Sequence, residues 1–445
     1  MEERKGIIAG KRVGVISLGC DKNRVDTEKM LALLSERHVL VNDIEKAQII
    51  IVNTCAFLNA SRKESVNETL AAAEYKKNGS AEKVIVTGCL PQKYVGELWK
   101  DLPEADAFLG VSDYGRRNEV IDEIYGEKRV NAVGTPCHEN TTARVPTTDG
   151  YAYLKIADGC SNHCTYCLIP KIRGEYRSVP KDELIAEIKG LKKVRELVLV
   201  AQDTARYGKD LQPETSLVQL IREISALKEV EGIRLLYCYP ENITDELIHE
   251  FRVNAKMIRY IDVPLQHADD VVLKKMNRKG TGEEYLALIE KLKREIPGIA
   301  VRSTFITGFP GETEEAFGNL LSFLEKADLF NAGFFKYSRE EGTAAYNLPD
   351  QIKESVKTAR LKKLYAAQKK IVKKHGAAAV GKTFKVFAEG FDENRLTYYG
   401  RAYFNAPDVD GKIYFFSAEE VKYGEFYNVK IIRPDGYDVI GERVL

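Results

Sequence analysis

Short apolar runs alternate with amphipathic stretches through the first 126 residues. Three of these runs end in a small or polar turn that carries a cysteine, and a stretch with helical spacing follows each turn. The runs cover residues 13–18, 49–52 and 84–86, and the helical stretches cover 24–37, 60–77 and 91–100. Continuous apolar strands that alternate with helices are typical of a parallel sheet covered on both faces. We therefore predict a doubly wound α/β domain over residues 10–126.

The same alternation returns in the middle of the chain, where six apolar runs are each followed by polar residues. The runs cover residues 151–156, 197–200, 233–237, 258–263, 300–306 and 332–335. Six strand–helix units predict an incomplete parallel barrel, in which polar residues at the C-terminal strand ends face the active site. We place this core at residues 151–376. Residues 127–150 are predicted to be a linker, because 135–149 are rich in Thr, Pro and polar residues.

The last part of the chain changes character twice. Residues 351–375 have helical spacing and nine Lys or Arg side chains that face only Glu354 as a counter-charge. Such a helix is either a solvated connector or a surface that contacts ribosomal or transfer RNA. Five short alternating strands then predict a small β-barrel of the oligonucleotide-binding type over residues 379–445. Residues 381–445 contain nine Lys and Arg against eleven Asp and Glu, which favours a basic protein over RNA as the barrel's partner.

Composition narrows the class of protein. The 445 residues are enough for about three domains, and the formal net charge of +1 gives no global field that favours nucleic acid or membrane. No apolar run approaches the roughly 20 residues of a membrane span, and residues 1–5 lack the apolar segment of a signal peptide. We expect a cytoplasmic protein without membrane contact. In that compartment cysteines are more often metal or redox ligands than disulfide partners, and we expect the same of the eight cysteines here.

Three cysteines crowd into one short stretch, residues 159–167. Cys160, Cys164 and Cys167 have the spacing CxxxCxxC, one ligand short of a closed tetrahedral zinc site. A cubane iron–sulfur cluster also takes four ligands, so three thiolates leave one iron open to a substrate or cofactor. A zinc loop with a distant fourth ligand, or cysteines that merely pack, are the alternatives. The tight spacing favours the cluster.

A second set of three cysteines is spread along the first domain. Cys20, Cys55 and Cys89 each follow a predicted strand, and parallel strands end at the same edge of a sheet, where ligands bind. We therefore expect these side chains to converge as a second three-thiolate cluster site. Cys137 and Cys238 show no such pattern and are predicted to be structural.

The CxxxCxxC stretch resembles the signature of the radical S-adenosylmethionine enzymes, including the aromatic residue before the third cysteine. The resemblance implies that the open iron binds the amino and carboxylate groups of the methionine part of this cofactor. Amide, cationic and hydroxyl groups at the strand ends suit such a zwitterion, and a glycine-rich loop allows close approach of the backbone. The candidates by position are Tyr166, Gln202, Gln266, Arg302, Thr304 and Gly308. Those at the strand ends could equally be capping or barrel-stabilising residues. No side chain is assigned as a catalytic acid or base, because radical hydrogen abstraction needs none.

Nearly the whole chain resembles the methylthiotransferases, which combine a three-cysteine domain, a radical S-adenosylmethionine core and a small terminal barrel. Stretches at residues 17–26, 53–57, 201–204, 262–267 and 400–411 resemble the RimO branch of this family. Asp21 departs mildly from the pattern, since many relatives are expected to have Pro there, but it touches no expected ligand position.

The resemblance implies two 4Fe-4S clusters, with S-adenosylmethionine as radical source and methyl donor. It implies that a methylthio group is added to the β-carbon of an aspartate of small-subunit ribosomal protein S-twelve, either free or within the ribosomal subunit. It also implies an electron donor such as a flavodoxin or ferredoxin. The acidic terminal barrel agrees with a basic ribosomal protein. A transfer-RNA adenosine methylthiotransferase is the alternative, and an iron–sulfur electron-transfer or carrier protein is a more remote one.

Overall fold

The structure of the protein is a computed structural model that describes residues 8–126, 128–138, 141–192 and 194–444. Residues 1–5, for which no signal peptide is predicted, lie outside the described residues, as do three positions of the predicted linker and residue 445. In the described part of the chain, no helix is long and apolar enough to cross a membrane. The chain divides into two compact units. The first comprises residues 1–147, 153–163 and 167–192, and the second comprises 148–152, 164–166 and 193–445.

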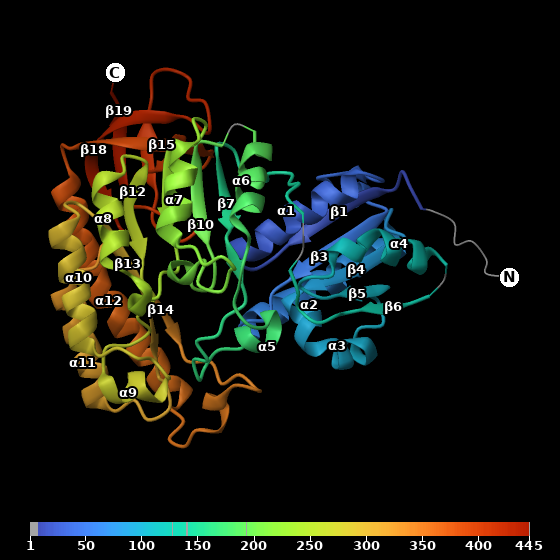
Figure 1. Ribbon diagram of the computed structural model, residues 1–445, viewed down its shortest axis with the longest axis horizontal. Helices are drawn as coiled ribbons and strands as arrows, with labels where there is room; N and C mark the ends of the chain where they lie inside the picture. The colour runs from blue at the N-terminus through green and yellow to red at the C-terminus, as the bar shows by residue number, and fades with distance from the viewer. Residues whose placement is uncertain (1–7, 127, 139–140, 193, 445) are drawn as a thin grey trace. The chain divides into compact units, whose positions relative to one another are not determined.

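The first unit is built on a six-stranded parallel sheet with the order β2-β1-β3-β4-β5-β6 (Figure 1). Its strands are β1 (Arg12–Ser17), β2 (Val39–Leu40), β3 (Ile49–Thr54), β4 (Lys83–Gly88), β5 (Ala107–Leu109) and β6 (Val130–Ala132). Its main helices are α1 (Asp21–Ser35), α2 (Asn59–Asn78), α3 (Cys89–Asp101) and α4 (Arg117–Tyr125). The predicted doubly wound parallel sheet is thereby confirmed.

Apolar residues cover both faces of this sheet. On one face, Leu34 of α1 and Ile121 of α4 pack against alternate residues of the strands, such as Ile51. The neighbouring residues along the strands point the other way, where they pack against α2 and α3. This two-sided burial is why β3 is a continuous apolar run rather than an alternating one.

Three strands of the first sheet were not predicted. They are β2, β5 and β6, which are only two or three residues long, too short for a hydrophobic period to stand out. Strand β6 lies within the predicted linker and adds an edge to the sheet, with Val130 and Ala132 buried and Asn131 exposed. The first unit also contains β8 (Ala157–Asp158), β9 (Arg177–Ser178), α5 (Ile169–Arg173) and α6 (Lys181–Gly190).

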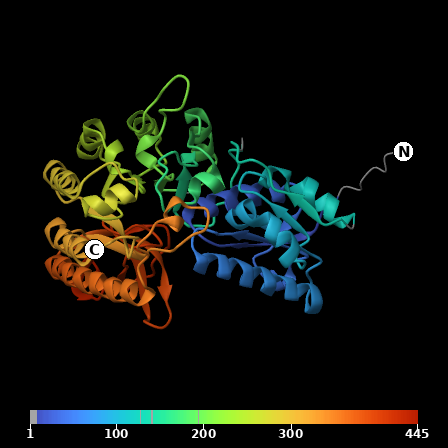
Figure 2. The same cartoon turned by 90° about the horizontal axis from the view of Figure 1, so that it is seen from below.

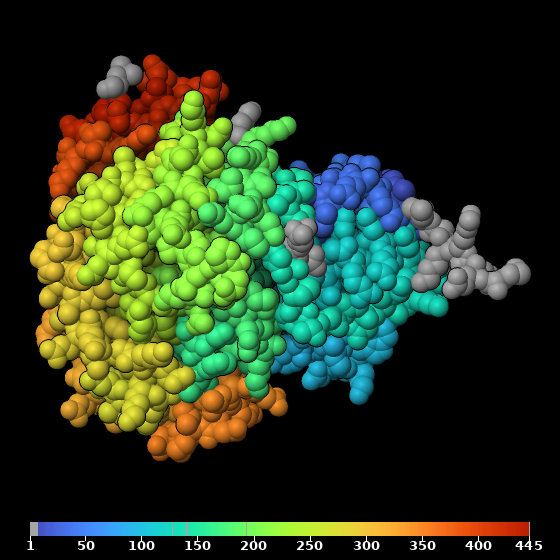
Figure 3. All heavy atoms as spheres, in the orientation of Figure 1, coloured from blue at the N-terminus to red at the C-terminus, as the bar shows by residue number. Residues whose placement is uncertain are grey.

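The predicted incomplete barrel is an open sheet with the order β14-β13-β12-β11-β10-β7, which belongs to the second unit except for residues 153–155 of β7. The strands are β7 (Tyr151–Lys155), β10 (Glu196–Val200), β11 (Gly232–Leu235), β12 (Met257–Asp262), β13 (Ala300–Thr307) and β14 (Asn331–Lys336). The helices between them are α7 (Leu217–Ala226), α8 (Asp245–Val253), α9 (Asp270–Lys275), α10 (Gly282–Glu295) and α11 (Glu314–Ala327). Atoms of this segment, coloured green to yellow, form a large part of the face seen in Figure 3. Phe305 of β13 packs edge-on against Phe323 of α11, with ring centroids 6.1 Å apart.

A long helix and a closed barrel complete the second unit. Helix α12 (Glu354–Ala379) packs beside α11 and β14 (Figure 2). The five strands predicted from the sequence close into a barrel with the order β15-β16-β17-β19-β18, so that this part of the fold is confirmed. They are β15 (Thr383–Asp392), β16 (Thr397–Arg401), β17 (Ile413–Phe416), β18 (Phe426–Asp435) and β19 (Asp438–Arg443).

Residues 401–410 of the terminal barrel lie against the core strands and are tied to them by buried charges. Glu196, the first residue of β10, pairs with Arg401 at 2.6 Å and with Arg234 of β11 at 2.8 Å. Asp410 accepts a hydrogen bond from the Tyr260 hydroxyl at 2.6 Å and pairs with Arg302 of β13 at 3.2 Å. The terminal barrel therefore closes this side of the core rather than hanging from it.

Candidate functional site

The first sheet places Cys20, Cys55 and Cys89 at one edge. Each follows the C-terminal end of a strand: Cys20 is the N-cap of α1 after β1, Cys55 follows β3, and Cys89 is the first residue of α3 after β4. Because β1, β3 and β4 are neighbours and run in parallel, their ends meet. The charges of Cys20 and Cys55 both act on the Cys89 thiol, which agrees with the convergence.

Two glycines make this close approach possible. Gly19 has a φ of 91°, and a Cβ there would lie 2.9 Å from the Cβ of Cys55. Gly88 has a φ of 94°, and a Cβ there would lie 2.3 Å from the Asn53 Oδ1 atom. Any other residue at either turn would be strained and would push the cysteine turns apart.

The thiols of this set differ in exposure. Cys20 is exposed, whereas Cys55 and Cys89 are buried. Burial raises the pKa of the Cys89 thiol to about 12, although the nearby Arg173 guanidinium opposes the shift. Burial also raises the pKa of Cys55. Iron binds the thiolate, so binding must supply the free energy that removes these protons.

This donor set fits an iron–sulfur cluster better than a single metal ion. Among the described residues, no three Cys, His, Asp or Glu side chains are placed to hold one ion together. A cubane cluster binds each thiolate to a different iron atom, so its ligands need not share one ion. Three thiolates at one edge of a sheet, two of them buried, suit such a cluster because iron–sulfur clusters prefer soft thiolate ligands. The assignment of Cys20, Cys55 and Cys89 stays a prediction.

The CxxxCxxC loop is held through its backbone. The N–H of Cys160 donates to the Gly174 carbonyl at 3.1 Å, and the N–H of Ile169 at the start of α5 donates to the Cys167 Sγ atom at 3.4 Å. Backbone N–H groups that point at a cysteine sulfur stabilise its thiolate form. The contact at Cys167 is therefore compatible with a role as a cluster ligand. That Cys160, Cys164 and Cys167 act together is inferred from their spacing in the sequence.

Cys164 has its own surroundings in the second unit. Its Sγ atom lies 2.6 Å from the Tyr239 hydroxyl, and the Arg278 guanidinium lies 3.7 Å from the centre of the Tyr239 ring. The next residue, Thr165, is fixed by a backbone hydrogen bond to Met276 at 3.1 Å. Sequence reasoning missed Tyr239 and Arg278, which follow no motif.

Of the predicted adenosylmethionine contacts, Gln266 follows β12, but Arg302 and Thr304 are the third and fifth of the eight residues of β13, so the expected place at the C-terminal strand end is wrong for Arg302. Gln266 has a φ of 73°, and its N–H donates to the Thr304 carbonyl at 2.8 Å. The Arg302 guanidinium donates to the Thr304 hydroxyl at 3.2 Å, and it also pairs with Asp262 at 2.9 Å and with Asp410. Arg302 therefore has a structural role in joining β13 to the terminal barrel, and its role toward the cofactor stays a prediction.

The other three predicted contacts lie in loops. Gln202 follows β10, and Tyr166 packs against the apolar cluster that contains Phe309. Gly308 has a φ of 75°, and its N–H donates to the Glu312 carboxylate. A Cβ at Gly308 would lie 2.3 Å from the side chain of Lys357, so packing against Lys357 also favours a glycine at this position. The roles of these residues toward a cofactor also stay predictions.

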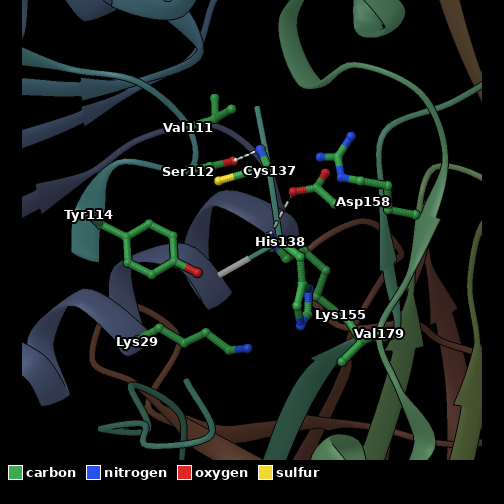
Figure 4. A pocket seen from close by; sticks show the side chains of 10 residues that line it. Lys29, Val111, Ser112, Tyr114, Cys137, His138, Lys155, Asp158 and Val179 are labelled. Atoms are coloured by element: carbon green, nitrogen blue, oxygen red, sulfur yellow. Dashed lines mark hydrogen bonds and ion pairs between the residues drawn. The ribbon is translucent and has the colours of Figure 1, made fainter. Parts of the chain in front are cut away.

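The two remaining cysteines lie apart from both sets. Cys137 lines a cavity of about 20 Å³ in the first unit, together with Lys29, Tyr114, His138 and Lys155 (Figure 4). That volume holds about one water molecule and is too small for a cofactor. Cys238 is fully buried and its N–H donates to the Asp262 carbonyl at 2.8 Å.

Arg173 is the most prominent residue that sequence reasoning missed. It is the last residue of α5, its side chain is 2% exposed, and it pairs with Asp26 and Asp158. Its Nη2 atom also lies 3.8 Å from the Cys89 Sγ atom. Its position six residues after Cys167 was the one available signal, but a single arginine at that spacing fits no pattern.

Three models of known protein families match parts of this chain. The radical SAM superfamily matches residues 154–324, the family described as "Uncharacterized protein family UPF0004" matches residues 12–110, and the TRAM domain matches residues 380–444. These matches, together with the relatives described next, imply S-adenosylmethionine and 4Fe-4S clusters as cofactors.

Two solved structures show the same fold at low sequence identity. One is the radical S-adenosylmethionine methyltransferase TsrM from Kitasatospora setae with cobalamin and a [4Fe-4S] cluster bound. Its TM-score is 0.55 at 15% identity, over 74% of this chain and 75% of that one. The other is the cobalamin-dependent S-adenosylmethionine radical enzyme OxsB, with a TM-score of 0.54 at 14% identity, over 81% of this chain and 56% of that one.

Curated relatives match over almost the full length. The chain is 46% identical to the ribosomal protein uS12 methylthiotransferase RimO of Acetivibrio thermocellus, over 97% of this chain and 98% of that protein. The protein of the same name from Trichlorobacter lovleyi is 44% identical, over 98% of this chain and 99% of that protein. This chain therefore belongs to the RimO family of ribosomal protein uS12 methylthiotransferases.

Proposed function

We propose that this protein adds a methylthio group to the β-carbon of an aspartate of ribosomal protein uS12 (S-twelve) in the cytoplasm. The observation that carries the proposal is the presence of two separate sets of three cysteines, each one thiolate short of a complete cluster site. An electron carrier needs no such open positions, whereas a transfer enzyme needs one to activate its cofactor and one to present sulfur. Membership in the RimO family supports the substrate.

The residues that would hold the cofactors are Cys160, Cys164 and Cys167 for one cluster and Cys20, Cys55 and Cys89 for the other. When bound, the clusters and S-adenosylmethionine supply a one-electron reductant, a carbon radical and the sulfur and methyl groups, chemistry that amino-acid side chains lack. The electron would come from a flavodoxin or ferredoxin.

The protein's own residues would bind the cofactor and orient the cluster ligands. The guanidinium of Arg302 contacts the hydroxyl of Thr304, and the backbone N–H of Gln266 donates to the Thr304 carbonyl. Together with the side-chain amide of Gln266, these groups would suit a zwitterionic ligand with carboxylate and amino groups. The Tyr239 hydroxyl contacts the Cys164 sulfur and would hold it in one orientation. No general acid or base is assigned.

Two surfaces support a ribosomal substrate. The acidic balance of the terminal barrel suits a strongly basic protein such as uS12. Helix α12 exposes six lysines, which suit the phosphates of RNA around that protein in the subunit. They are Lys362, Lys363, Lys369, Lys370, Lys373 and Lys374. We therefore propose that the substrate is uS12 within the small subunit.

The test is the intact mass of uS12 after anaerobic incubation with the reconstituted enzyme, a reductant and S-adenosylmethionine. We expect a gain of one methylthio group that fragmentation assigns to one aspartate, with more product from intact subunits than from free uS12. A methylthiolated adenosine in transfer RNA, with uS12 unchanged, would move the proposal to the alternative substrate. Absence of both products and of released 5′-deoxyadenosine would contradict it.

A further inference from the structure

We propose that Arg173 is a positioning residue for the N-terminal cluster, and that its guanidinium raises the reduction potential of that cluster through an N–H···S hydrogen bond to Cys89. The inference rests on the proposed function, because it takes Cys20, Cys55 and Cys89 as cluster ligands. It concerns a residue for which neither the sequence motifs nor the family matches suggest a role.

The side chain of Arg173 is fixed from several directions. Its Nη1 atom donates to both carboxylate oxygens of Asp158, at 2.9 and 3.1 Å. Its Nη2 atom donates to Asp26 at 3.0 Å and to the Asn23 side-chain oxygen at 2.6 Å. Only 2% of the side chain is exposed, so the guanidinium keeps one position. That position leaves the Nη2 atom 3.8 Å from the Cys89 sulfur, so that one of its two hydrogens is shared between the sulfur and an oxygen of Asn23 or Asp26.

Loss of the thiol proton would strengthen this contact. In the protonated form, the Cys89 thiol donates to the Asn23 Oδ1 atom at 3.7 Å. A cysteine that binds iron has lost this proton and acts only as an acceptor. Arg173 is then a charged donor facing a negative sulfur, and charge-assisted hydrogen bonds are shorter and stronger than neutral ones.

The electrostatic surroundings favour an effect on potential. The charge of Arg173 is balanced by Asp26 and Asp158, and Asp26 and Asp158 also pair with Lys155. This network of described residues therefore holds two cations and two anions, and of these four charged groups it is the Arg173 guanidinium that contacts the sulfur. A positive donor stabilises the reduced form, which carries one more negative charge, more than the oxidised form.

Arg173 also belongs to the segment that holds the CxxxCxxC loop. The next residue, Gly174, accepts the backbone N–H of Cys160 at 3.1 Å. Helix α5 in addition packs its Leu168 and Ile172 side chains into the apolar cluster that contains Cys89. One short segment thus contacts a cysteine of each set within the first unit.

The test measures the N-terminal cluster alone. In the full chain, Cys160, Cys164 and Cys167 are replaced by Ala, and Arg173→Gln is added. After anaerobic reconstitution, we expect the cluster of the Arg173→Gln variant to be about tenfold harder to reduce, a shift of about 59 mV to more negative potential. Arg173→Lys keeps the charge but not the planar fork, and its potential should lie between the two.

Arg144→Gln is the matched control. Arg144 is also buried, with 1% of its side chain exposed, and also bridges two carboxylates, those of Glu28 and Glu187. Its replacement should lower stability to a similar degree and leave the potential unchanged. Equal potentials in the Arg173→Gln and parent proteins would overturn the inference while leaving the proposed function intact. A parent protein that binds no iron would overturn both.

If Arg173→Gln fails to fold, the hydrogen bond can still be tested in the protein that keeps Arg173. The parent with ¹⁵N-labelled arginine is reduced and examined by pulsed electron paramagnetic resonance. We expect a hyperfine coupling to guanidinium nitrogen that disappears in Arg173→Lys. The absence of any such coupling in the parent would contradict the hydrogen bond.

Discussion

The two sets of cysteines are built in opposite ways. Cys20, Cys55 and Cys89 come from three turns spread over 70 residues of sequence, and the order of the parallel sheet brings them to one edge. Cys160, Cys164 and Cys167 lie within eight consecutive positions, and their proximity is a property of one loop. The first set therefore depends on the packing of a whole domain, whereas the spacing of the second is set within one loop, to which Tyr239 and Met276 add contacts. Damage to one should leave the ligands of the other in place.

The largest effect should come from removal of one ligand of each set. We expect Cys164→Ala to abolish formation of 5′-deoxyadenosine and of the product, because cofactor cleavage needs the loop cluster. Cys89→Ala should abolish the methylthio product but leave 5′-deoxyadenosine formation. Chromatography of the nucleoside and the mass of uS12 measure both. Loss of deoxyadenosine in Cys89→Ala, with the loop cluster still loaded, would contradict the division of roles.

Gly19→Ala and Gly159→Ala form a matched pair that tests the independence of the two sets. A Cβ at Gly159 would lie 2.0 Å from the Glu175 carbonyl oxygen, and one at Gly19 would lie 2.9 Å from the Cys55 Cβ atom. Both positions have φ near 80–90°, so each substitution should cost about 1–3 kcal/mol of local strain. We expect the iron bound per chain to fall by up to half in each variant. The loss should come from the Cys20, Cys55 and Cys89 set in Gly19→Ala and from the loop set in Gly159→Ala. Mössbauer or resonance Raman spectra of the two variants should differ accordingly; identical spectra would show that the sets are not independent.

A loss of stability between the terminal barrel and the core strands should leave both sets of cysteines with their iron. Burial alone would raise the pKa of Glu196, but Arg401 and Arg234 outweigh it and hold the pKa below its ordinary value. Because the folded-state pKa is depressed, the pairs stabilise the protein above the unfolded-state pKa of about 4.5, and this stabilisation is lost as the pH falls through the folded-state value.

We expect Glu196→Gln to lower the free energy of unfolding by about 3 kcal/mol at pH 7. The difference between this variant and the native protein should shrink below pH 4. Denaturant titrations at several pH values measure both effects, and iron content at pH 7 should stay unchanged. A constant difference down to pH 3 would contradict the ion-pair explanation.

The smallest effect concerns substrate contact rather than either cysteine set. Replacement of Lys363 and Lys370 by Gln should weaken binding to the small subunit about threefold at physiological salt and lower the salt dependence of binding by nearly two counterions. Modification of free uS12 should not change. Filter binding at several salt concentrations measures the slope. An unchanged slope would mean that α12 is only a solvated connector.

The comparison also explains what the sequence could predict. The loop set was evident from spacing, and the N-terminal set followed from the strand–turn–Cys repeat together with the rule for parallel strands. Strand β6 was missed because a three-residue strand has no measurable period. Arg173, Tyr239 and Arg278 were missed for another reason. Arg173 contacts Cys89 and Tyr239 contacts Cys164 across 84 and 75 positions of sequence, Arg278 lies over the Tyr239 ring, and no local pattern marks such partners. Arg302 was predicted from its expected place near the strand end, but its ion pair with Asp410 depends on the terminal barrel, which sequence periodicity does not place.

The buried charges between residues 401–410 and the core strands have a consequence for protein engineering. Without the terminal barrel, Glu196, Arg234 and Arg302 would each lose a partner supplied by that barrel, and the face of the core that the barrel covers would be uncovered. The barrel is thus part of the catalytic core's folding unit and not a detachable recognition tag. A chimera that exchanges terminal barrels between relatives, to change which macromolecule is modified, would have to carry over Arg401 and Asp410 or replace their core partners at the same time.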